Sequence, residues 1–377
     1  MSRVNQRMTA RTAGVRKWAN LPLLIVVGLL LLFGAIVVYS ATSGFAAGGA
    51  MFRRQLLGIT LGLVALAFMW VLDYKKLAGW LGPLVVLNSL LIISPLIPGL
   101  GVEAKGATAW VQIAGVRLLQ PSEPAKLLTI VIMAIIISQY KGVIERPRDI
   151  MRVLAYLALP FGLILLQPDL GTGLVFIAIT MGMLLVGGLK LRWFLVFALI
   201  GVIAAGAVFR FGLLQQYQED RLLVFVQPDR DPRGAGYNLE QSKIAIGSGG
   251  LTGKGLGQGT QSNLNFLPER HTDFIFSVLG EELGFTGTIM LLGLYLALLM
   301  VALEISTSSR DLFGSLIVVG LISMWTFQIL QNMGMTMGLM PITGIPLPFI
   351  SFGSSFMLLN LAGTGMLLSV WARRSGV

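Results

Sequence analysis

Long apolar stretches follow one another along almost the whole chain, and polar residues are largely confined to the connections between them. A helix needs about 20 mostly apolar residues to cross a hydrocarbon core about 30 Å thick. Ten stretches approach this length: residues 21–40, 55–72, 77–96, 123–138, 151–166, 170–189, 191–213, 274–303, 312–335 and 347–371. The pattern predicts an all-α polytopic membrane protein with about ten transmembrane helices.

The first stretch follows Arg16 and Lys17 and resembles the apolar core of a secretory signal peptide. Such a core has roughly 7–15 residues, whereas this stretch is longer and a second one follows closely. We therefore expect a retained first helix.

Composition supports a lipid environment. Of 377 residues, 55% are hydrophobic and 12% are charged, about half the charged share of soluble proteins, and the mean hydropathy is +0.81.

A net charge of +11 would suggest nucleic-acid binding in a soluble chain. Here the basic residues are spread over the connections, which favours bilayer orientation and attraction to anionic headgroups. The absence of cysteine and the single His271 exclude disulfides, cysteine nucleophiles and a histidine-rich metal centre.

Lys and Arg residues lie mainly on one side of the predicted helices, and this bias sets orientation because cytoplasmic loops carry the excess of these residues. That side carries Arg3, Arg7, Arg11, Arg16, Lys17, Lys75, Lys76, Lys141, Arg146, Arg148, Arg152, Lys190, Arg192, Arg310, Arg373 and Arg374. The short loops opposite carry Arg53, Arg54, Lys105 and Arg117. We therefore predict that both termini are cytoplasmic, in agreement with an even number of spans.

One connection, residues 214–273, is far longer than the others, polar and glycine-rich, and falls on the outer face. Loops above about 12–15 residues without regular structure are uncommon unless they are functional or disordered. Tyr217, Tyr237 and Phe266 favour a loop folded against the helices. We identify no soluble domain, linker or repeat, so we expect a single membrane domain, 1–377, whose working surface lies outside.

Charged side chains inside membrane spans are costly and are therefore functional candidates. Glu123 and Lys126 open the fourth span with an i,i+3 spacing that lets them pair, either for function or only as a neutral helix end. Asp169 lies between two apolar runs at the outer surface, where it caps the next helix, serves an active site, or does both. Glu281 and Glu282 are adjacent in the eighth span. We expect one to face the bundle and the other a neighbour or water, in a structural role or with a cation.

The densest polar cluster stands where the long loop re-enters the membrane. It consists of Glu269, Arg270, His271, Thr272 and Asp273, followed by the apolar run 274–276. A helix start needs only one capping residue, here Thr272 or Asp273. Five consecutive polar groups therefore favour an active site over a bare cap.

Two weaker matches concern phosphate and metal binding. The stretch 247–255 contains Gly-Lys, but a Walker A loop needs glycine at 248 and Ser or Thr at 255, where this chain has Ser248 and Gly255. We reject a P-loop, although its backbone amides could bind a lipid diphosphate or simply form a flexible turn. Asp229 and Asp231 have the D-x-D spacing of soluble nucleotide-sugar transferases, but the α/β domain of those enzymes is not indicated by the pattern.

Four runs in the same order resemble the SEDS family (shape, elongation, division, sporulation), most closely its elongation members. They read QPSE at 120–123, QPDLGT at 167–172, QSKIAIGSGG at 241–250 and FLPERHTDF at 266–274. The run PITGIPLP at 341–348 and the long outer loop between the seventh and eighth spans agree with this resemblance. Two positions depart from the family pattern: Ala109 replaces an arginine, and Ser354 replaces a glycine.

The resemblance implies a peptidoglycan glycosyltransferase that polymerises lipid II at the outer face of the bacterial inner membrane. It also implies a class B penicillin-binding protein and other elongation-complex membrane proteins as partners. The family's catalytic aspartate falls on Asp273, and its other sensitive polar positions fall on Glu123, Lys126 and Asp169.

The residue types fit this chemistry. Lipid II carries an α-linked sugar on a diphosphate and the new linkage is β, so one inverting displacement needs a base for the acceptor hydroxyl and positive charge for the diphosphate. We assign the base to Asp273 and the diphosphate to Arg270, Lys243, Lys105 and Arg53, with Glu269, His271 and Thr272 in supporting positions. A divalent cation, Mg²⁺ or Mn²⁺, held by carboxylates and diphosphate oxygens is compatible with these residues.

Two other functions are alternatives at this point. A lipid II flippase is expected to show inverted repeats and polar groups near the bilayer midplane, whereas here the charges gather at the outer boundary. A non-catalytic scaffold for a crosslinking enzyme would need no acid–base cluster beside Phe274. Polymerisation of lipid II by the purified protein in detergent would separate the enzyme from both.

Overall fold

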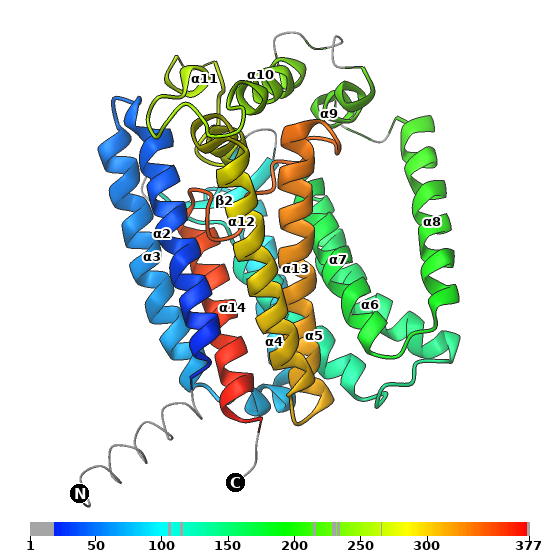
Figure 1. The fold of residues 1–377 in the computed structure, drawn as a ribbon. Helices are drawn as coiled ribbons and strands as arrows, with labels where there is room; N and C mark the ends of the chain where they lie inside the picture. Colours follow the sequence, from blue (N-terminus) through cyan, green and yellow to red (C-terminus); the bar gives the residue numbers. More distant parts are fainter. Residues whose placement is uncertain are drawn as a thin grey trace, which may run out of the picture.

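The computed structural model describes residues 19–104, 107–113, 116–212, 214, 216–227, 231, 234–264 and 266–374. Within this part, ten helices each overlap one of the predicted spans, and all of them except α8 pack into a bundle (Figure 1). They are α2 (Leu21–Ser43), α3 (Gly48–Val71), α4 (Leu81–Ile93), α5 (Ser122–Ser138), α6 (Pro147–Leu165), α7 (Leu170–Val186), α8 (Leu191–Arg210), α12 (Ile275–Thr307), α13 (Leu312–Met337) and α14 (Ser354–Ala372). The prediction of a mainly helical polytopic membrane fold is confirmed.

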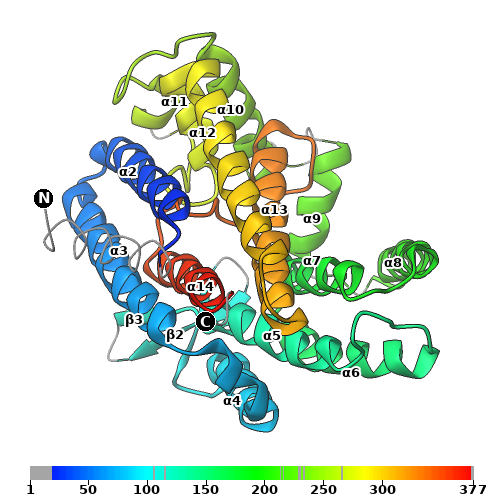
Figure 2. The same ribbon diagram turned by 60° about the horizontal axis from the view of Figure 1, so that its bottom comes forward.

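Seven stretches of the described chain are long and apolar enough to cross a membrane. They are Leu21–Ser43, Gly48–Val71, Tyr74–Leu96, Leu191–Val208, Ile275–Thr307, Leu312–Met337 and Ser354–Ala372. The third combines α4 with the short 3₁₀ helices η1 (Tyr74–Trp80) and η2 (Ser94–Leu96). The helices α5 and α7 have 17 residues each, and α6 carries charges in its first two turns. Since α5 and α7 pack on α13 and α6 packs on both, all three belong to the same bundle (Figure 2).

Local chemistry fixes several helix ends. Asn20 caps α2 by accepting the amide of Leu23, and Asp311 caps α13 by accepting the amide of Gly314 at 2.7 Å. The helix α13 ends at Gly338, whose φ of +77° is the left-handed conformation that favours glycine.

The helices α3 and α14 pack closely because glycines remove side chains from their contact. A Cβ on Gly365 of α14 would lie 2.4 Å from the backbone oxygen of Leu66, and a Cβ on Gly58 of α3 would lie 2.8 Å from Cα of Ser354. The departure from the family pattern at Ser354 is therefore accommodated by a glycine on the facing helix.

A small antiparallel sheet was missed in the sequence. Strands β1 (Gly101–Ala104), β2 (Ala107–Ile113) and β3 (Val116–Leu119) pair in the order β1-β2-β3 between α4 and α5. Each strand has only four to seven residues, too few for a clear alternating pattern. Ala109, the second departure from the family pattern, is buried in β2.

The long connection contains helices that the sequence analysis did not predict: α9 (Gln216–Val226), α10 (Ala235–Ser248) and α11 (Thr260–Asn263). They lie at one end of the bundle, and the start of α2 and the end of α14 lie at the opposite end (Figure 1). Because α10 packs on α12 and α13, the connection is folded against the bundle, as expected. Basic residues in 1–18 and the Asp229 position lie outside the described residues.

The helix α8 stands apart from the other helices (Figures 1 and 2). Its span Leu191–Val208 contributes no buried residue. The exposed side chains are large and apolar, among them Leu195, Leu199 and Val202, so this helix is suited to contact lipid on most of its surface.

Candidate active site

The predicted polar cluster forms a tight turn directly before α12. The helix begins at Ile275 with Phe274 at the N-cap position and has no side-chain cap. The capping alternative for Thr272 and Asp273 is therefore wrong. Thr272 instead donates its hydroxyl to Glu269 Oε2 at 3.0 Å, and Asp273 is half-buried.

Asp273 rests on a non-helical segment between α13 and α14. Asn332 of α13 donates its side-chain amide to the backbone oxygens of Asp273 at 2.9 Å and Ile345 at 2.8 Å. A Cβ built on Gly344 would lie 3.5 Å from Asp273 Oδ2. The helix α13 thus holds the backbone of Asp273, and the segment between α13 and α14 borders its carboxylate.

This non-helical stretch, residues 339–353, is called the crossing segment here. Part of it was predicted to belong to the last helix, which instead starts at Ser354. Ile345, Leu347, Phe349, Ile350 and Ser351 are buried. Irregular backbone is tolerated at membrane depth only where protein satisfies its polar groups.

Side chains from several helices supply those hydrogen bonds. Tyr295 of α12 donates to Pro348 O at 2.7 Å, Gln331 of α13 donates to Pro341 O at 2.8 Å, and Gln55 of α3 accepts the Gly353 amide at 3.1 Å. The turn before α12 is joined to the same segment, since Ser351 Oγ donates to Thr272 O at 2.7 Å. The crossing segment is therefore fixed by its surroundings.

Asp169 lies at another border of the crossing segment. Its carboxylate accepts the Thr172 amide at 3.0 Å and the Thr172 hydroxyl at 2.7 Å, so its predicted role as the N-cap of α7 is confirmed. A Cβ on Gly171 would lie 2.7 Å from Thr343 O. The start of α7 thus contacts the residue next to Gly344, and the Asp169 turn and Asp273 flank the same segment.

Glu123 and Lys126 form the predicted pair. Lys126 Nζ lies 2.8 Å from Glu123 Oε1, and both residues are buried, with exposed fractions of 2% and 3%. Lys126 Nζ also lies 5.8 Å from the ring centroid of Phe356, in the first turn of α14. The pair therefore supports the helix that follows the crossing segment.

Arg270 and His271 pack against the end of α2. Arg270 is 1% exposed, donates Nε to Ala41 O at 2.8 Å and lies 4.0 Å from the ring centroid of Phe45. Burial lowers the pKa of the Arg270 guanidinium, and the Glu282 carboxylate opposes this shift. His271 lies between the rings of Phe45 and Phe352, so both residues anchor the turn to neighbouring elements.

The other basic candidates are placed differently. Arg53, near the start of α3, and Lys243, on α10, are exposed. Lys105 and the side chain of Arg117 lie outside the described residues. The predicted binding of diphosphate by these residues therefore stays a prediction.

Glu281 and Glu282 face two different neighbours, as expected, and both are buried. Glu281 contacts the outer connection, and Glu282 contacts α2. The helix α12 is interrupted directly after this pair, at Gly284, where φ is +63° and ψ is −157°. Sequence reasoning also missed Asn332 and Gln55 as supports of the site. Their only signal was a polar residue inside an apolar span.

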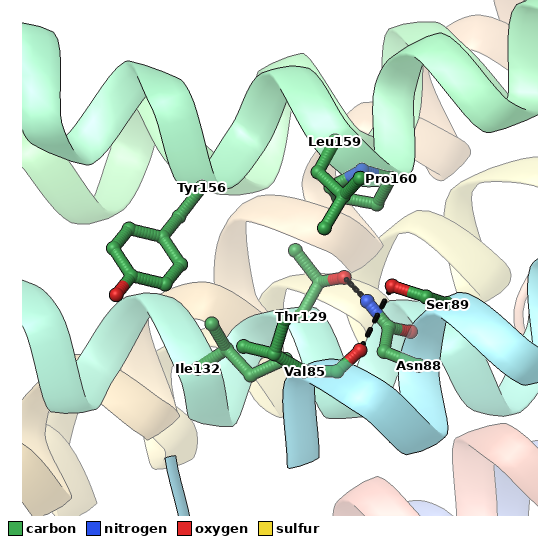
Figure 3. Close-up of a pocket in the computed structure, with 8 residues that line it drawn as sticks. All are labelled: Val85, Asn88, Ser89, Thr129, Ile132, Tyr156, Leu159 and Pro160. Carbon is green, nitrogen blue, oxygen red and sulfur yellow. Dashed lines mark hydrogen bonds between the residues drawn. The ribbon is translucent and has the colours of Figure 1, made fainter. Parts of the chain in front are cut away.

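No group of three or more His, Asp or Glu side chains that could hold a metal ion occurs in the described parts of the chain. A small pocket lies between α4, α5 and α6 (Figure 3). It is lined by Asn88, whose amide donates to Thr129 Oγ1 at 3.0 Å, and by the helix-interior Pro160.

The bundle and its buried crossing segment define a multi-pass membrane protein with a polar site near one end. Residues 18–376 match the model of the FtsW/RodA/SpoVE family of cell cycle proteins. The chain belongs to this family, which confirms the SEDS resemblance.

Relatives and solved structures agree over nearly the full length. The probable peptidoglycan glycosyltransferase FtsW of Trichlorobacter lovleyi is 37% identical (94% of this chain, 93% of the relative), and the peptidoglycan glycosyltransferase MrdB of Escherichia coli K12 is 37% identical (92% and 93%). A chain of a peptidoglycan synthase complex that coordinates polymerization and crosslinking superposes with a TM-score of 0.79 at 32% identity (94% and 98%). The rod shape determining protein RodA of Thermus thermophilus superposes with a TM-score of 0.70 at 30% identity (95% and 98%).

Proposed function

We propose that this chain is a peptidoglycan glycosyltransferase that polymerises lipid II during cell elongation, with Asp273 as the general base. The enzyme class is supported by relatives that carry this name at 37% identity over most of the chain. The observation that carries the assignment of the base is the placement of Asp273. Its backbone is held by Asn332 and its carboxylate borders Gly344, in a turn at the end of the bundle where α9–α11 lie.

The proposed reaction is a single inverting displacement. The acceptor sugar 4-hydroxyl attacks the anomeric carbon of the donor, and the bond from that carbon to the diphosphate oxygen breaks with both electrons. The hydroxyl proton passes to the Asp273 carboxylate. The diphosphate leaves as an anion, so the reaction needs no acid of the kind that glycosidases use. The positive charges of the exposed Lys243 and Arg53 would stabilise the diphosphate leaving group.

The membrane setting follows from the same placement. The bias of Lys and Arg towards the loops opposite α9–α11 supports cytoplasmic termini and a site that faces the periplasm of the bacterial inner membrane. A class B penicillin-binding protein is the proposed partner, supported by the match to a synthase complex that couples polymerization to crosslinking. The chain would act as one membrane domain, 1–377, with 214–273 as its outer connection.

The test is glycan synthesis by the purified protein in detergent from labelled lipid II. Asp273→Asn keeps the shape of the side chain but cannot accept the proton, and loss of a general base costs on the order of 10²–10⁴-fold in rate. We expect Asp273→Asn to insert, bind lipid II and bind the partner, yet to make almost no polymer. The matched control is Asp220→Asn on α9, which should polymerise normally.

Near-normal polymer from Asp273→Asn would refute the assignment of the base. No polymer from the unmodified protein, alone or with its partner, would instead favour the flippase or the scaffold. Because detergent leaves no membrane to cross, a flippase has no measurable activity in this assay.

A further inference from the structure

The helix α12 is interrupted near its start, and the outer connection fills the interruption. The break is at Gly284. On its N-terminal side, the backbone oxygen of Glu281 accepts the amide of Lys254 at 3.0 Å, and that of Glu282 accepts the amide of Gly255 at 2.9 Å. Two helical carbonyls are therefore paired with the loop instead of with their own helix.

The loop also forms hydrogen bonds on the C-terminal side of the break. Phe285 donates its amide to Gly250 O at 2.9 Å, and Thr286 donates to Leu251 O at 3.0 Å. In an uninterrupted α-helix these two amides would donate to residues 281 and 282. Residues 250–255 are thus inserted into the helical ladder and make four hydrogen bonds in place of two.

Glycines make this insertion possible. A Cβ on Gly284 would lie 2.4 Å from Gly253 N, and a Cβ on Gly249 would lie 1.9 Å from Gly280 O. Both distances are far below van der Waals contact, so two backbones approach where no side chain fits. This close contact explains the glycine-rich run 247–255, which does not match a phosphate-binding loop.

Glu281 adds a second set of contacts to the same loop. Its Oε1 accepts from Lys254 Nζ at 2.8 Å, Thr260 Oγ1 at 3.1 Å and the Gln261 amide at 2.9 Å. The carboxylate has no exposed surface. Charge-assisted bonds of this kind are stronger than neutral ones, so Glu281 ties the loop firmly to α12.

Glu282 makes the corresponding link to α2. Its Oε2 accepts the Ser40 hydroxyl at 2.6 Å, and Ser40 Oγ in turn accepts the Gly257 amide at 2.8 Å. One residue of α12, one of α2 and one of the outer connection therefore meet at a single hydroxyl group. Arg270, which anchors the turn before α12, bonds to the neighbouring Ala41 of α2.

We propose that Glu281 and Glu282 are positioning residues, which hold the segment 275–283 and the adjoining Asp273 in place through the outer connection and α2. This inference rests on the proposed function. The segment has no continuous helical ladder to the rest of α12, so its orientation depends on these contacts. A displacement of the base by about 1 Å costs on the order of 10²-fold in rate, without loss of the surfaces that bind substrate.

The first experiment compares Glu281→Gln, Lys254→Met and Glu304→Gln in the full-length protein. Glu304 is an exposed glutamate near the opposite end of the same helix and is the matched control. For the first two variants we expect kcat for lipid II polymerisation to fall ten- to hundredfold with KM within twofold. Glu281→Asp should recover part of the lost kcat. An unchanged kcat, or a change confined to KM, would overturn the proposal.

Amide hydrogen exchange of the same proteins reports positioning without reference to catalysis. Peptides covering 268–286 should exchange faster in Glu281→Gln and Lys254→Met than in Glu304→Gln. Asp273→Asn belongs in the same series. If it polymerises normally, the proposed base fails, while the exchange data still decide whether Glu281 and its contact with Lys254 position the segment. Unchanged exchange in both loop variants would refute the positioning role alone.

A crosslink guards against variants that simply misfold. The chain has no cysteine, and a Cβ on Gly257 would lie 4.0 Å from Ser40 Oγ, so Ser40→Cys with Gly257→Cys brings two thiols together. The reduced protein lacks the Ser40 bridge and should be slow. Oxidation should restore activity at least severalfold, because the disulfide replaces the bridge. An oxidised protein less active than the reduced one would show that the docked loop is not the active arrangement.

Discussion

The carboxylate of Asp273 borders the backbone of Gly344, where a Cβ would lie 3.5 Å from Oδ2. Gly344 has a φ of +70°, which L side chains adopt only at a cost. The backbone conformation therefore favours glycine at this position, 71 residues downstream of the proposed base, and a methyl group there would be in van der Waals contact with the carboxylate.

Replacement of Gly344 by alanine should impair catalysis. The added methyl group is in contact with the carboxylate and the backbone strain costs about 1–2 kcal/mol, so the geometry of the base should shift. We expect kcat to fall at least tenfold in the lipid II assay. The control is Gly99→Ala, which has a φ of +86° but open space around it. Equal losses in both variants would show that strain, and not the contact with Asp273, is responsible.

Glu123 and Lys126 should behave as a coupled pair. Removing one partner of a buried ion pair leaves an uncompensated charge and costs about 3–5 kcal/mol. Glu123→Gln and Lys126→Met should each lower thermal stability and polymerisation, and the double variant should lose less than the sum of the two. A double-mutant cycle on unfolding in detergent measures the coupling. Strict additivity would contradict the 2.8 Å pair.

Asn332→Leu should uncouple the base from the crossing segment. The substitution leaves the carbonyls of Asp273 and Ile345 without their donor, and each unsatisfied buried group costs about 1–3 kcal/mol. Stability and kcat should both decrease. Gln328→Leu is a matched control on α13, because the Gln328 amide is buried and has no hydrogen-bond partner among the described residues. That control should be neutral or more stable than the unmodified protein.

Gly365→Ala should weaken the contact between α3 and α14. Its Cβ would be forced to within 2.4 Å of Leu66 O, and overpacking of this kind costs about 1–3 kcal/mol. The melting temperature in detergent should fall. Gly82→Ala on α4, where nothing lies within 4 Å, should leave it unchanged or raise it. The idea fails if the two variants melt alike.

The parts of the fold that the sequence predicted are those with a local cause. A run of about 20 apolar residues is sufficient to identify a membrane helix, so all ten helices were placed. The Asp169 cap and the Glu123–Lys126 pair depend on neighbours three residues away, and both were predicted. The sheet at 101–119 was missed because its strands are short and their pairing is what stabilises them.

The parts that were not predicted depend on contacts between distant segments. The burial of Glu281 and Glu282 depends on the outer connection and on α2, which cover them, and the break at Gly284 depends on loop residues about 30 positions upstream. Periodicity describes one helix at a time, so it does not reveal contacts with distant segments. The supports Asn332 and Gly344 are recognisable only once the crossing segment is seen against Asp273.

The crossing segment also determines when the enzyme becomes competent during its synthesis. Asp273 is translated about 70 residues before Gly344, and at about 5–20 residues per second the proposed base exists for several seconds without its support. The segment's remaining partners lie on α3, α12 and α13, so it settles only after those helices have assembled. We therefore expect a chain that ends before Gly344 to make no polymer.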